Sequence, residues 1–263
     1  MTYQIDKALH PWRVPFLNTA FDNVDLSQVR EVVARHIRTR EPGYMVSLNT
    51  DIDITLERDP EFMAAHRNAS LILLDSQPLF NLARKQGIPV KEKISGSDLM
   101  GPACQWAAEG GWSVFVFGGM PGVPERAAEN LSKAYPGLEV AGTLSPDYGF
   151  ERNPAKLADA LARVREVTPD ILFVCLGAPK SEKLVHEHVS DFGTPFTLIV
   201  GAAVDFWAGN VKRAPKWISD HSLEWLYRFL QEPRRLFKRY FVDSWKLLGI
   251  IQKYGKTAGG ETR

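Results

Sequence analysis

Several polar side chains that could do chemistry stand directly after short apolar runs. Asp75 follows four apolar residues, Leu71–Leu74, so its carboxylate would be partly removed from water. Partial desolvation raises the proton affinity of a carboxylate and makes it a candidate general base. Aspartate is also a good N-cap, and the spacing alone favours a cap for the helix that we expect after Pro78. Both roles stay open at this point.

Glycine-rich turns follow two other apolar runs and could bind phosphate. Phe117 is followed by Gly118 and Gly119, and the amides of such a turn, with the start of the next helix, can hold phosphate oxygens. The turn matches neither a dinucleotide-binding fingerprint nor a P-loop, so an ordinary tight turn is the alternative. A second turn ends in Pro179 and Lys180, whose cation would suit a diphosphate, although a lysine here can also be merely solvated.

Metal chemistry has weaker support. Asp51 and Asp53 form the DxD pattern by which many sugar transferases hold a metal against a nucleotide diphosphate, but so short a match arises often by chance. His186 and His188 are two positions apart on an expected helix, so they face different ways, and no third ligand is close in sequence. We therefore expect neither a metal site nor a cofactor.

The elements that position these residues alternate regularly along the chain. Because the strand-like runs are continuously apolar, we expect an α/β fold with a parallel sheet covered by helices on both faces. Residues 1–24, rich in proline, asparagine and aromatic residues, are expected to wrap the surface. The expected strands lie in YMVSLNT, SLILLD, WSVFVFGG, LEVAGTLSPDYGF, DILFVCLGAPK and FTLIVGAAVDFWAG. The expected helices are Leu26–Arg40, one near Pro60–Arg67, one after Pro78, Leu99–Glu109, Val123–Ala134, Pro154–Val167 and one after Pro179.

In a sheet of this kind, ligands bind outside the carboxyl ends of the strands. The residues that end the strands should therefore converge in space, although they are scattered in sequence. They are Asn49, Thr50, Asp75, Gly118, Gly119, Gly142, Thr143, Gly177 to Lys180 and Gly201 to Asp205.

The C-terminal part of the chain differs from the rest in charge. Residues 212–256 carry eleven Lys and Arg against four Asp and Glu, whereas residues 1–211 carry 20 against 26. The overall charge of +1 thus conceals two parts of opposite sign, and the basic part indicates an anionic surface or ligand. We do not expect nucleic acid as a partner, because the larger part of the chain is acidic.

No segment of the sequence is suited to crossing a membrane. The longest apolar run, Phe196–Val204, has nine residues, and a spanning helix needs about 20. The first residues lack the pattern of a secretory signal. Cys104 and Cys175 lie far apart in apolar surroundings, and we expect two buried thiols.

Two helices are expected in the basic part, Lys216–Gln231 and, after Pro233, Arg234–Tyr254. On the second, basic and apolar residues lie on opposite sides, which is typical of a helix at a membrane interface. Packing on the body, or against another copy of the chain in a homo-oligomer, is the alternative. The basic stripe contains Arg235, Arg239, Lys246 and Lys253, and the opposite side contains Leu236, Phe237, Tyr240, Phe241, Leu247, Leu248 and Ile251.

Longer blocks of sequence resemble the WecG/TagA/CpsF family of glycosyltransferases (glycosyltransferase family 26), from about Val14 to Tyr240. The series RAP, LEWLYR and EPRR in the basic part is the most specific, because it is long and has little chance frequency. The other blocks are LNTDID, LLDSQPLFNLARKQGIPVKEKISGSDL, FVFGGMPGVPERAAENLSKAYPGLEVAG, PDILFVCLGAPKSEK and VGAAVDFWAGNVK.

The resemblance implies an inverting, metal-independent glycosyltransferase with a Rossmann-like body. Such enzymes move a sugar from a nucleotide-sugar donor to a sugar on a polyprenyl diphosphate at the cytoplasmic face of the plasma membrane, where we expect a peripheral protein. The family's catalytic aspartate falls on Asp75, which favours the general base over the cap. Donor- or acceptor-binding roles are expected for Asn49, Thr50, Lys93, Ser97, Asp98, Gly118, Gly119, Gly142, Pro179, Lys180, Glu182, Asp205, Arg213, Glu224, Arg228, Arg234 and Arg235.

Three differences from the family pattern bear on the donor sugar. Ser76 stands where the family usually has glycine, Lys93 where it commonly has arginine, and Ser181 where it usually has glutamine. Because these differences change the hydrogen-bond donors of the pocket, we expect glucose from UDP-glucose, as in a GumM-like exopolysaccharide branch of the family. The alternatives are N-acetylmannosamine or its uronate, or a non-catalytic subunit that binds nucleotide sugars.

The resemblance also implies a division of the chain. We expect residues 1–208 to form the catalytic body, 209–256 a helical appendage that meets the membrane and completes the site, and 257–263 a frayed end.

A competing functional class is an NAD-type α/β protein. Such a protein would show GxGxxG after its first strand and an acidic residue about 20 positions later, and neither is present in the sequence.

Overall fold

The computed structural model describes residues 5–6, 8–211 and 244–255 of the chain. Its strands are β1 (Arg13–Phe16), β2 (Thr19–Asp22), β3 (Gly43–Leu48), β4 (Leu71–Leu74), β5 (Ser113–Gly118), β6 (Glu139–Leu144), β7 (Ile171–Cys175) and β8 (Phe196–Ile199). Its helices are α1 (Leu26–Thr39), α2 (Thr50–Leu56), α3 (Pro60–Arg67), α4 (Gln77–Lys85), α5 (Gly96–Gly110), α6 (Val123–Ala134), the 3₁₀ turn η1 (Phe150–Arg152), α7 (Pro154–Val167), α8 (Lys180–His188), α9 (Ala203–Trp207) and α13 (Ser244–Tyr254).

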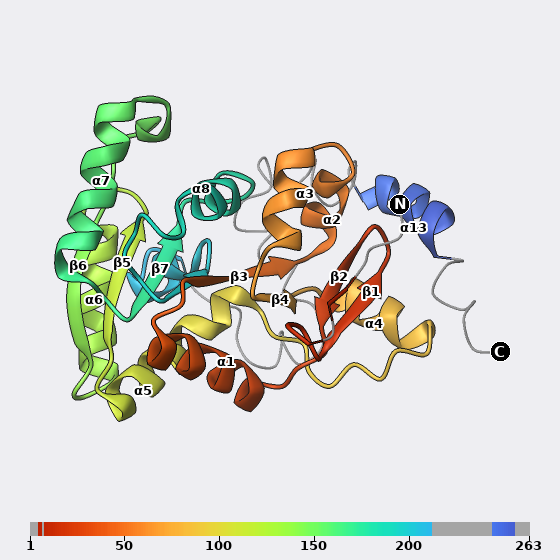
Figure 1. Ribbon diagram of the computed structural model, residues 1–263, viewed down its shortest axis with the longest axis horizontal. Helices are drawn as coiled ribbons and strands as arrows, with labels where there is room; N and C mark the ends of the chain where they lie inside the picture. The colour runs from red at the N-terminus through yellow and green to blue at the C-terminus, as the bar shows by residue number, and fades with distance from the viewer. Residues whose placement is uncertain (1–4, 7, 212–243, 256–263) are drawn as a thin grey trace.

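A parallel sheet lies at the centre of the described residues, in the order β4-β3-β8-β7-β5-β6 (Figure 1). Every residue of β3, β4, β7 and β8 is buried, which explains why these runs are continuously apolar. The expectation of a parallel α/β sheet is therefore confirmed.

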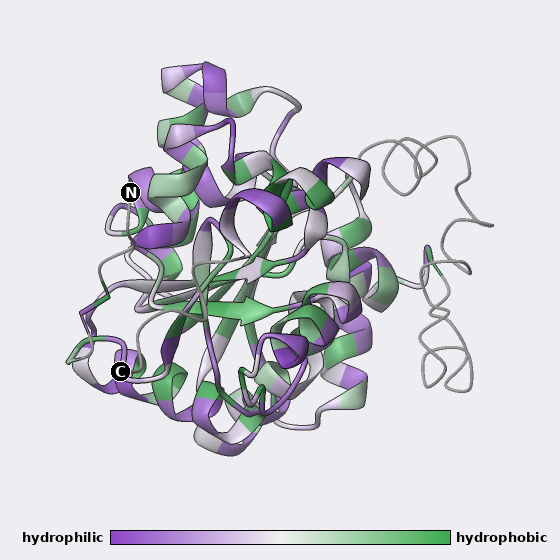
Figure 2. Cartoon of the chain, turned by 90° about the vertical axis from the view of Figure 1, so that its right-hand side faces the viewer, coloured by the Kyte–Doolittle hydropathy of each residue, from purple (hydrophilic) through white to green (hydrophobic). Residues whose placement is uncertain are grey.

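Helices cover both faces of the sheet and form two separate cores. Successive strand residues point to opposite faces, so Val114 and Val116 pack with α1, α5, α6 and α9. Phe115 and Phe117 pack with α2, α3, α4, α7 and α8 on the other face. Figure 2 shows the apolar residues gathered along the strands, with hydrophilic residues on the outer sides of the helices. Both cysteines are buried free thiols, as expected.

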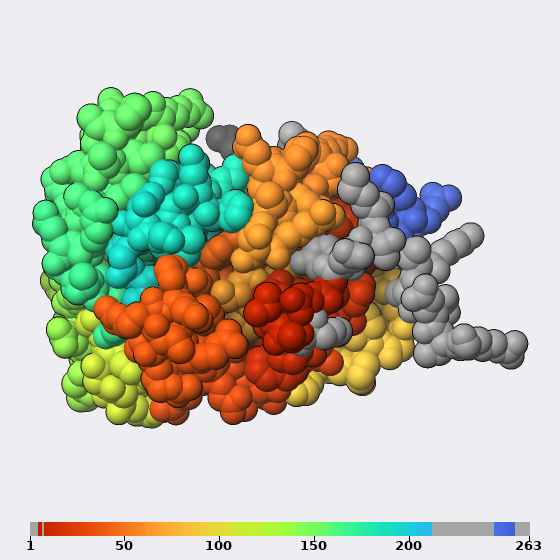
Figure 3. Space-filling view, in the orientation of Figure 1, coloured from red at the N-terminus to blue at the C-terminus, as the bar shows by residue number. Residues whose placement is uncertain are grey.

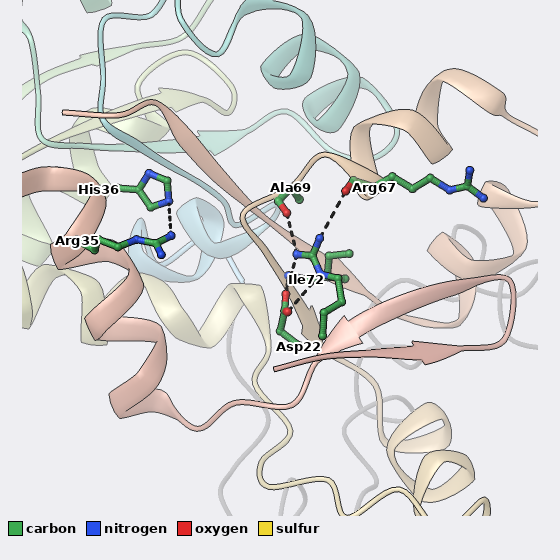
Figure 4. Close-up of polar contacts among 7 residues, drawn as sticks. Asp22, Arg35, His36, Arg67, Ala69 and Ile72 are labelled. Atoms are coloured by element: carbon green, nitrogen blue, oxygen red, sulfur yellow. Dashed lines mark hydrogen bonds and ion pairs between the residues drawn. The ribbon is translucent and has the colours of Figure 1, made fainter. Parts of the chain in front are cut away.

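The N-terminal residues form a buried antiparallel hairpin rather than a surface wrap. Phe16 and Phe21 are almost fully buried against the second core, and β2 packs beside β4. Arg13 donates to Asp22 (Nη2–Oδ2, 2.9 Å) and to the carbonyl oxygen of Ala69 (2.7 Å), beside the sheet edge (Figure 4). The expectation for residues 1–24 was wrong here, because a buried ion pair makes polar residues compatible with an interior position.

Helix α13 lies against α2 at one end of the molecule (Figures 1 and 3). Ile250 is buried and Leu247 packs against the second core, so one side of the helix docks on the body. Leu248, expected beside Leu247 on the apolar side, is instead 55% exposed. Lys253, expected in the basic stripe, contacts the body through Glu57. Residues 216–231 and 234–243, where helices were also expected, lie outside the described residues.

Candidate active site at the carboxyl edge of the sheet

The ends of β3 and β4 bring Asn49 and Asp75 close together. The two strands are neighbours, with Leu48 opposite Leu74, and the amide of Asp75 donates to the carbonyl oxygen of Leu48 (2.9 Å). Asn49 and Asp75 therefore leave adjacent strands at the same level of the sheet. Both are half-buried, as a polar residue at the mouth of a sheet should be.

The structure separates Asp75 from the capping role that spacing alone favours. The N-cap residue of α4 is Ser76, and its side chain makes no capping hydrogen bond. Asp75 thus precedes the N-cap residue of α4 and is not that residue.

Asn49 begins α2, a helix that we did not expect. Its side-chain oxygen accepts hydrogen bonds from the amides of Asp51 and Ile52, both at 3.1 Å, which is an N-cap. The next residue, Thr50, is half-buried in the first turn. Asparagine before TDIDITL was the signal that could have predicted this helix.

The DxD pattern is part of the same helix and does not form a paired site. Asp51 and Asp53 are two positions apart, so they leave α2 in different directions. Asp53 is fully buried, and neither of its carboxylate oxygens has a hydrogen-bond partner. Burial, and then the nearby charge of Glu57, raise the pKa of Asp53 to about 7.

The start of α5 approaches the middle of the sheet. A Cβ atom on Gly96 would lie 2.6 Å from the Ser47 hydroxyl oxygen on β3 and 3.2 Å from the carbonyl oxygen of Ile199 on β8. The contact places Ser97 and Asp98, in the same helical turn, near the carboxyl ends of β3 and β8. Ser97 lies 2.9 Å from the hydroxyl of Ser95.

Lys93 lies next to the end of β4. The following residue, Ile94, donates its amide to the carbonyl oxygen of Leu74 (3.1 Å), the residue before Asp75. Lys93 is half-buried. The segment before α5 therefore brings a cation to the edge of the sheet that holds Asp75.

The turn after β5 requires glycine. Gly118 has φ +106°, and a Cβ atom on it would lie 2.8 Å from the backbone of Cys175 in β7. Gly119 has φ +92°, and its carbonyl oxygen accepts from the Ser145 hydroxyl (2.7 Å), which joins this turn to the segment after β6. At the carboxyl edge of the sheet, the backbone of this turn therefore lies against the backbone of β7, in a conformation that glycine adopts without steric strain.

Gly142 does not lie at a strand end, contrary to our expectation. It lies within β6, beside Phe115, and a Cβ atom on it would lie 2.6 Å from the Phe115 ring. The glycine leaves space for that ring, so its position reflects packing between β5 and β6. Its neighbour Thr143 also lies within the strand.

The turn after β7 directs a lysine toward the segment after β6. Pro179 follows a cis peptide bond and is the N-cap residue of α8. The Lys180 ammonium lies 3.9 Å from a carboxylate oxygen of Glu151 and 5.5 Å from the ring centre of Tyr148. The Tyr148 side chain is 98% exposed. Sequence reasoning missed both Tyr148 and Glu151, because nothing local links residues 148–151 to the turn after β7.

Glu182 lies in the first turn of α8 and is buried. Only 3% of it is exposed, and its Oε2 atom has no hydrogen-bond partner. Burial raises the pKa of this carboxyl to about 7. Near neutral pH a large fraction of Glu182 is therefore uncharged and able to donate a hydrogen bond.

The strand that comes last among the described residues, β8, leads to Asp205 on the short helix α9. Asp205 is half-buried and accepts a hydrogen bond from the Asn210 side chain (3.4 Å). Five further predicted residues lie outside the described part of the chain: Arg213, Glu224, Arg228, Arg234 and Arg235. The described site residues thus come from the ends of β3, β4, β5, β7 and β8, and the part around Asn49, Asp75, Lys93 and Ser97 is the most tightly connected.

A surface hollow of about 580 Å³ lies elsewhere, along α1. Trp12, Arg30, Arg35 and Arg38 line it, and none of the predicted site residues does. Two of its arginines have partners in the protein: Arg30 pairs with Glu109 at 2.9 Å, and Arg35 contacts His36 (Figure 4). Residue chemistry at the sheet edge therefore locates the candidate site better than the hollow does.

Comparison with known proteins identifies the family of this chain. The family model for WecG/TagA/CpsF glycosyl transferases matches residues 14–259, nearly the whole chain. The chain belongs to this family. It is therefore a glycosyltransferase, and the expectation drawn from the sequence blocks is confirmed.

Curated members of the family are similar along most of their length. An N-acetylglucosaminyldiphosphoundecaprenol N-acetyl-β-D-mannosaminyltransferase from Bacillus spizizenii is 28% identical over 87% of this chain and 83% of its own. Proteins of the same name from Bacillus subtilis and Staphylococcus aureus are 26% and 25% identical, over 91% and 85% of this chain and 88% and 87% of theirs. The names of these three relatives specify transfer of N-acetylmannosamine, and none of them mentions glucose.

Within residues 5–6, 8–211 and 244–255, no helix is both long enough and apolar enough to cross a bilayer.

Proposed function

We propose that this chain transfers N-acetylmannosamine from a nucleotide-sugar donor to N-acetylglucosamine carried on a polyprenyl diphosphate. The observation that carries the proposal is the similarity, over more than four fifths of the chain, to relatives named for that activity. The proposal replaces our expectation of UDP-glucose, which rested on three local differences in sequence.

The proposed mechanism is a single displacement with Asp75 as the general base. The carboxylate takes the proton from the acceptor hydroxyl while that oxygen attacks the anomeric carbon of the donor. The bond from this carbon to the diphosphate breaks on the opposite side, so the configuration inverts. The electron pair leaves with the nucleoside diphosphate, and Asp75 ends the step protonated. Its half-buried position at the end of β4 supports this role.

Negative charge on the leaving diphosphate needs donors that are already in place. The backbone of the turn at Gly118 and Gly119 and the Lys180 ammonium are the donors we propose from the described residues. Arg213, Arg228 and Arg234 of the basic part are the further cations we propose, by resemblance to the family. No metal enters this scheme, because Asp51 and Asp53 leave α2 in different directions.

We further propose that the chain works as a peripheral protein on the inner face of the plasma membrane. Its acceptor would be anchored there by a polyprenyl chain. The excess of Lys and Arg in residues 212–256 would favour contact with an anionic lipid surface, where each cation contributes about 1 kcal/mol.

Incubation with a panel of labelled donors tests the proposal. The purified chain is mixed with UDP-N-acetylmannosamine, UDP-glucose, UDP-N-acetylglucosamine or GDP-mannose and a short-chain N-acetylglucosaminyl diphosphate lipid. We expect transfer from UDP-N-acetylmannosamine alone, measured as label in the lipid product. Transfer from UDP-glucose in its place would overturn the proposed donor and restore the earlier expectation.

The variant Asp75→Asn tests the mechanism in the same assay. Removal of a well-placed base should lower kcat by about 10²–10⁴-fold. The matched control is Asp159→Asn, which removes an exposed carboxylate on α7 that pairs with Arg163 one turn away. Equal melting temperatures would show that both variants fold. Near-normal turnover by Asp75→Asn would remove Asp75 from the role of base.

A further inference from the structure

Helix α13 docks on α2, although the two are far apart in sequence. Ile250 is 6% exposed, and Leu247 packs against the core that also contains Ile52 and Leu56 of α2. Figure 1 shows the two helices side by side near the β1–β2 hairpin. An apolar contact therefore brings the C-terminal end of α13 to the C-terminal end of α2.

Glu57, the residue that ends α2, is the polar centre of this contact. Its carboxylate accepts hydrogen bonds from the Lys253 ammonium (2.5 Å) and the Tyr254 hydroxyl (3.0 Å), both on α13. It also receives the side-chain amide of Asn18, from the turn of the hairpin, at 3.2 Å. Burial opposes the charge of Glu57, but these hydrogen bonds outweigh it and lower the pKa of this carboxyl.

Asp53 shows that the pairing is selective. It lies one turn before Glu57 on the same side of α2, where residues four apart are neighbours. It is fully buried and has no hydrogen-bond partner for either oxygen. Lys253 therefore pairs with Glu57, at the end of the helix, and not with the neighbouring Asp53.

The opposite end of α2 lies at the proposed site. The helix has seven residues, and Asn49 and Thr50 form its start beside Asp75. So short a helix is marginal by itself, and its position depends on what packs around it. Whatever holds Glu57 therefore also helps to place Asn49 and Thr50.

We infer that α13 is a positioning strap: Lys253 and Glu57 hold α2, and through it Asn49 and Thr50, in place relative to Asp75. The inference rests on the proposed function, because it assigns these residues to the same site. Neither Lys253 nor Glu57 touches the reacting atoms. Both act through α2, so they are positioning residues.

Kinetics of Lys253→Met, Glu57→Gln and the double variant test the strap. Misplacement of a positioned group by ~1 Å can cost up to ~10²-fold, so we expect each single variant to lose about tenfold in kcat. The KM for donor or acceptor should rise together with this loss, because Asn49 and Thr50 are the binding residues that α2 places. The double variant should be no slower than either single one, since both remove the same contact. Lys253→Arg should keep most of the turnover.

The control is Arg163→Met, which removes a cation from an exposed ion pair on α7 (3.0 Å to Asp159). It should leave kcat unchanged. If Lys253→Met and Glu57→Gln also leave kcat unchanged, or if their losses simply add in the double variant, the strap is overturned.

Hydrogen exchange gives a second readout that needs no turnover. The amides of residues 53–56 in α2 should exchange faster in Lys253→Met than in the wild type, and at the wild-type rate in Arg163→Met. Unchanged exchange in Lys253→Met overturns the strap. Faster exchange with unchanged kcat also overturns it, because α13 would then only cover α2. If the wild type transfers no sugar from any donor, the proposed function fails, and exchange alone decides whether α13 holds α2.

Discussion

At the scale of single residues, two buried carboxyls distinguish this structure. Asp53 on α2 and Glu182 on α8 are each at most 3% exposed, and burial raises the pKa of each to about 7. A carboxylate away from water is costly unless it is paired, so both favour the protonated form. The family blocks pointed to Glu182 as a site residue, whereas its burial and altered acidity come from the way α8 packs.

The pH dependence of stability should reveal Glu182. The unfolded chain loses this proton near pH 4.5, whereas the fold keeps it to about pH 7. The folded state therefore binds more protons between these values, and the stability that this proton contributes is lost as pH rises through that window. We expect Glu182→Gln to remove this loss. The free energy of unfolding of the variant, relative to that of the wild type, should therefore be about 3 kcal/mol higher at pH 8 than at pH 4.5.

Urea unfolding at both pH values measures the effect. Glu187→Gln is the control, because Glu187 is on the same helix and its side chain is 75% exposed. If the free energies of unfolding of Glu182→Gln and wild type differ by the same amount at both pH values, the raised pKa of Glu182 is contradicted.

At the scale of elements, the β1–β2 hairpin depends on one buried ion pair. Asp22 accepts from Arg13 and from the amide of Ile72 on β4 (2.8 Å), and Arg13 also donates to the backbone before β4. The pair thus connects the hairpin to β4, the edge strand of the sheet and the strand that leads to Asp75. The same hairpin carries Asn18, which contacts Glu57.

Removal of Arg13 should destabilise the whole fold. The variant Arg13→Met leaves Asp22 buried and uncompensated, and breaking a buried pair in this way costs about 3–5 kcal/mol. The comparison is Arg30→Met, which breaks an exposed pair with Glu109 and should cost less than about 1 kcal/mol. Urea unfolding at pH 7 measures both. If Arg13→Met lowers the free energy of unfolding by less than Arg30→Met does, the hairpin does not depend on the Arg13–Asp22 pair.

At the scale of the whole molecule, an acidic body carries a basic C-terminal part and an exposed apolar edge. Trp245 and Leu248 of α13 are 72% and 55% exposed, on the side of the helix away from α2. An exposed tryptophan beside cationic residues is typical of a protein that meets a membrane interface. The proposed strap and the proposed membrane contact thus use opposite sides of one helix.

Vesicle binding tests the membrane contact. We expect the chain to sediment with vesicles that contain phosphatidylglycerol, and weakly with phosphatidylcholine alone. Binding should fall between 0.1 M and 1 M salt, where the screening length drops from about 10 Å to about 3 Å. Trp245→Ala should weaken binding by about tenfold, because burial of a large apolar side chain contributes roughly 1.5–3 kcal/mol. Equal binding to both vesicle types would refute the electrostatic contribution.

The sequence by itself determined what depends on neighbours along the chain. Apolar runs predicted the parallel sheet, and proline starts with clear stops predicted α6 and α7 at their observed bounds. Long motif blocks indicated the family, and charge counts showed two parts of opposite sign. A short helix such as α2 was missed, because its pattern is too brief to stand out from the strand before it.

Only the tertiary structure decided what depends on residues distant in sequence. It set Leu48 opposite Leu74, which puts Asn49 beside Asp75. It inserted β8 between β3 and β7, and joined Glu57 to Lys253 across 196 residues. Burial, strand order and altered acidity are properties of the packed chain, and local propensity carries no information about them. Such contacts form only when the apolar faces of separate segments are buried together.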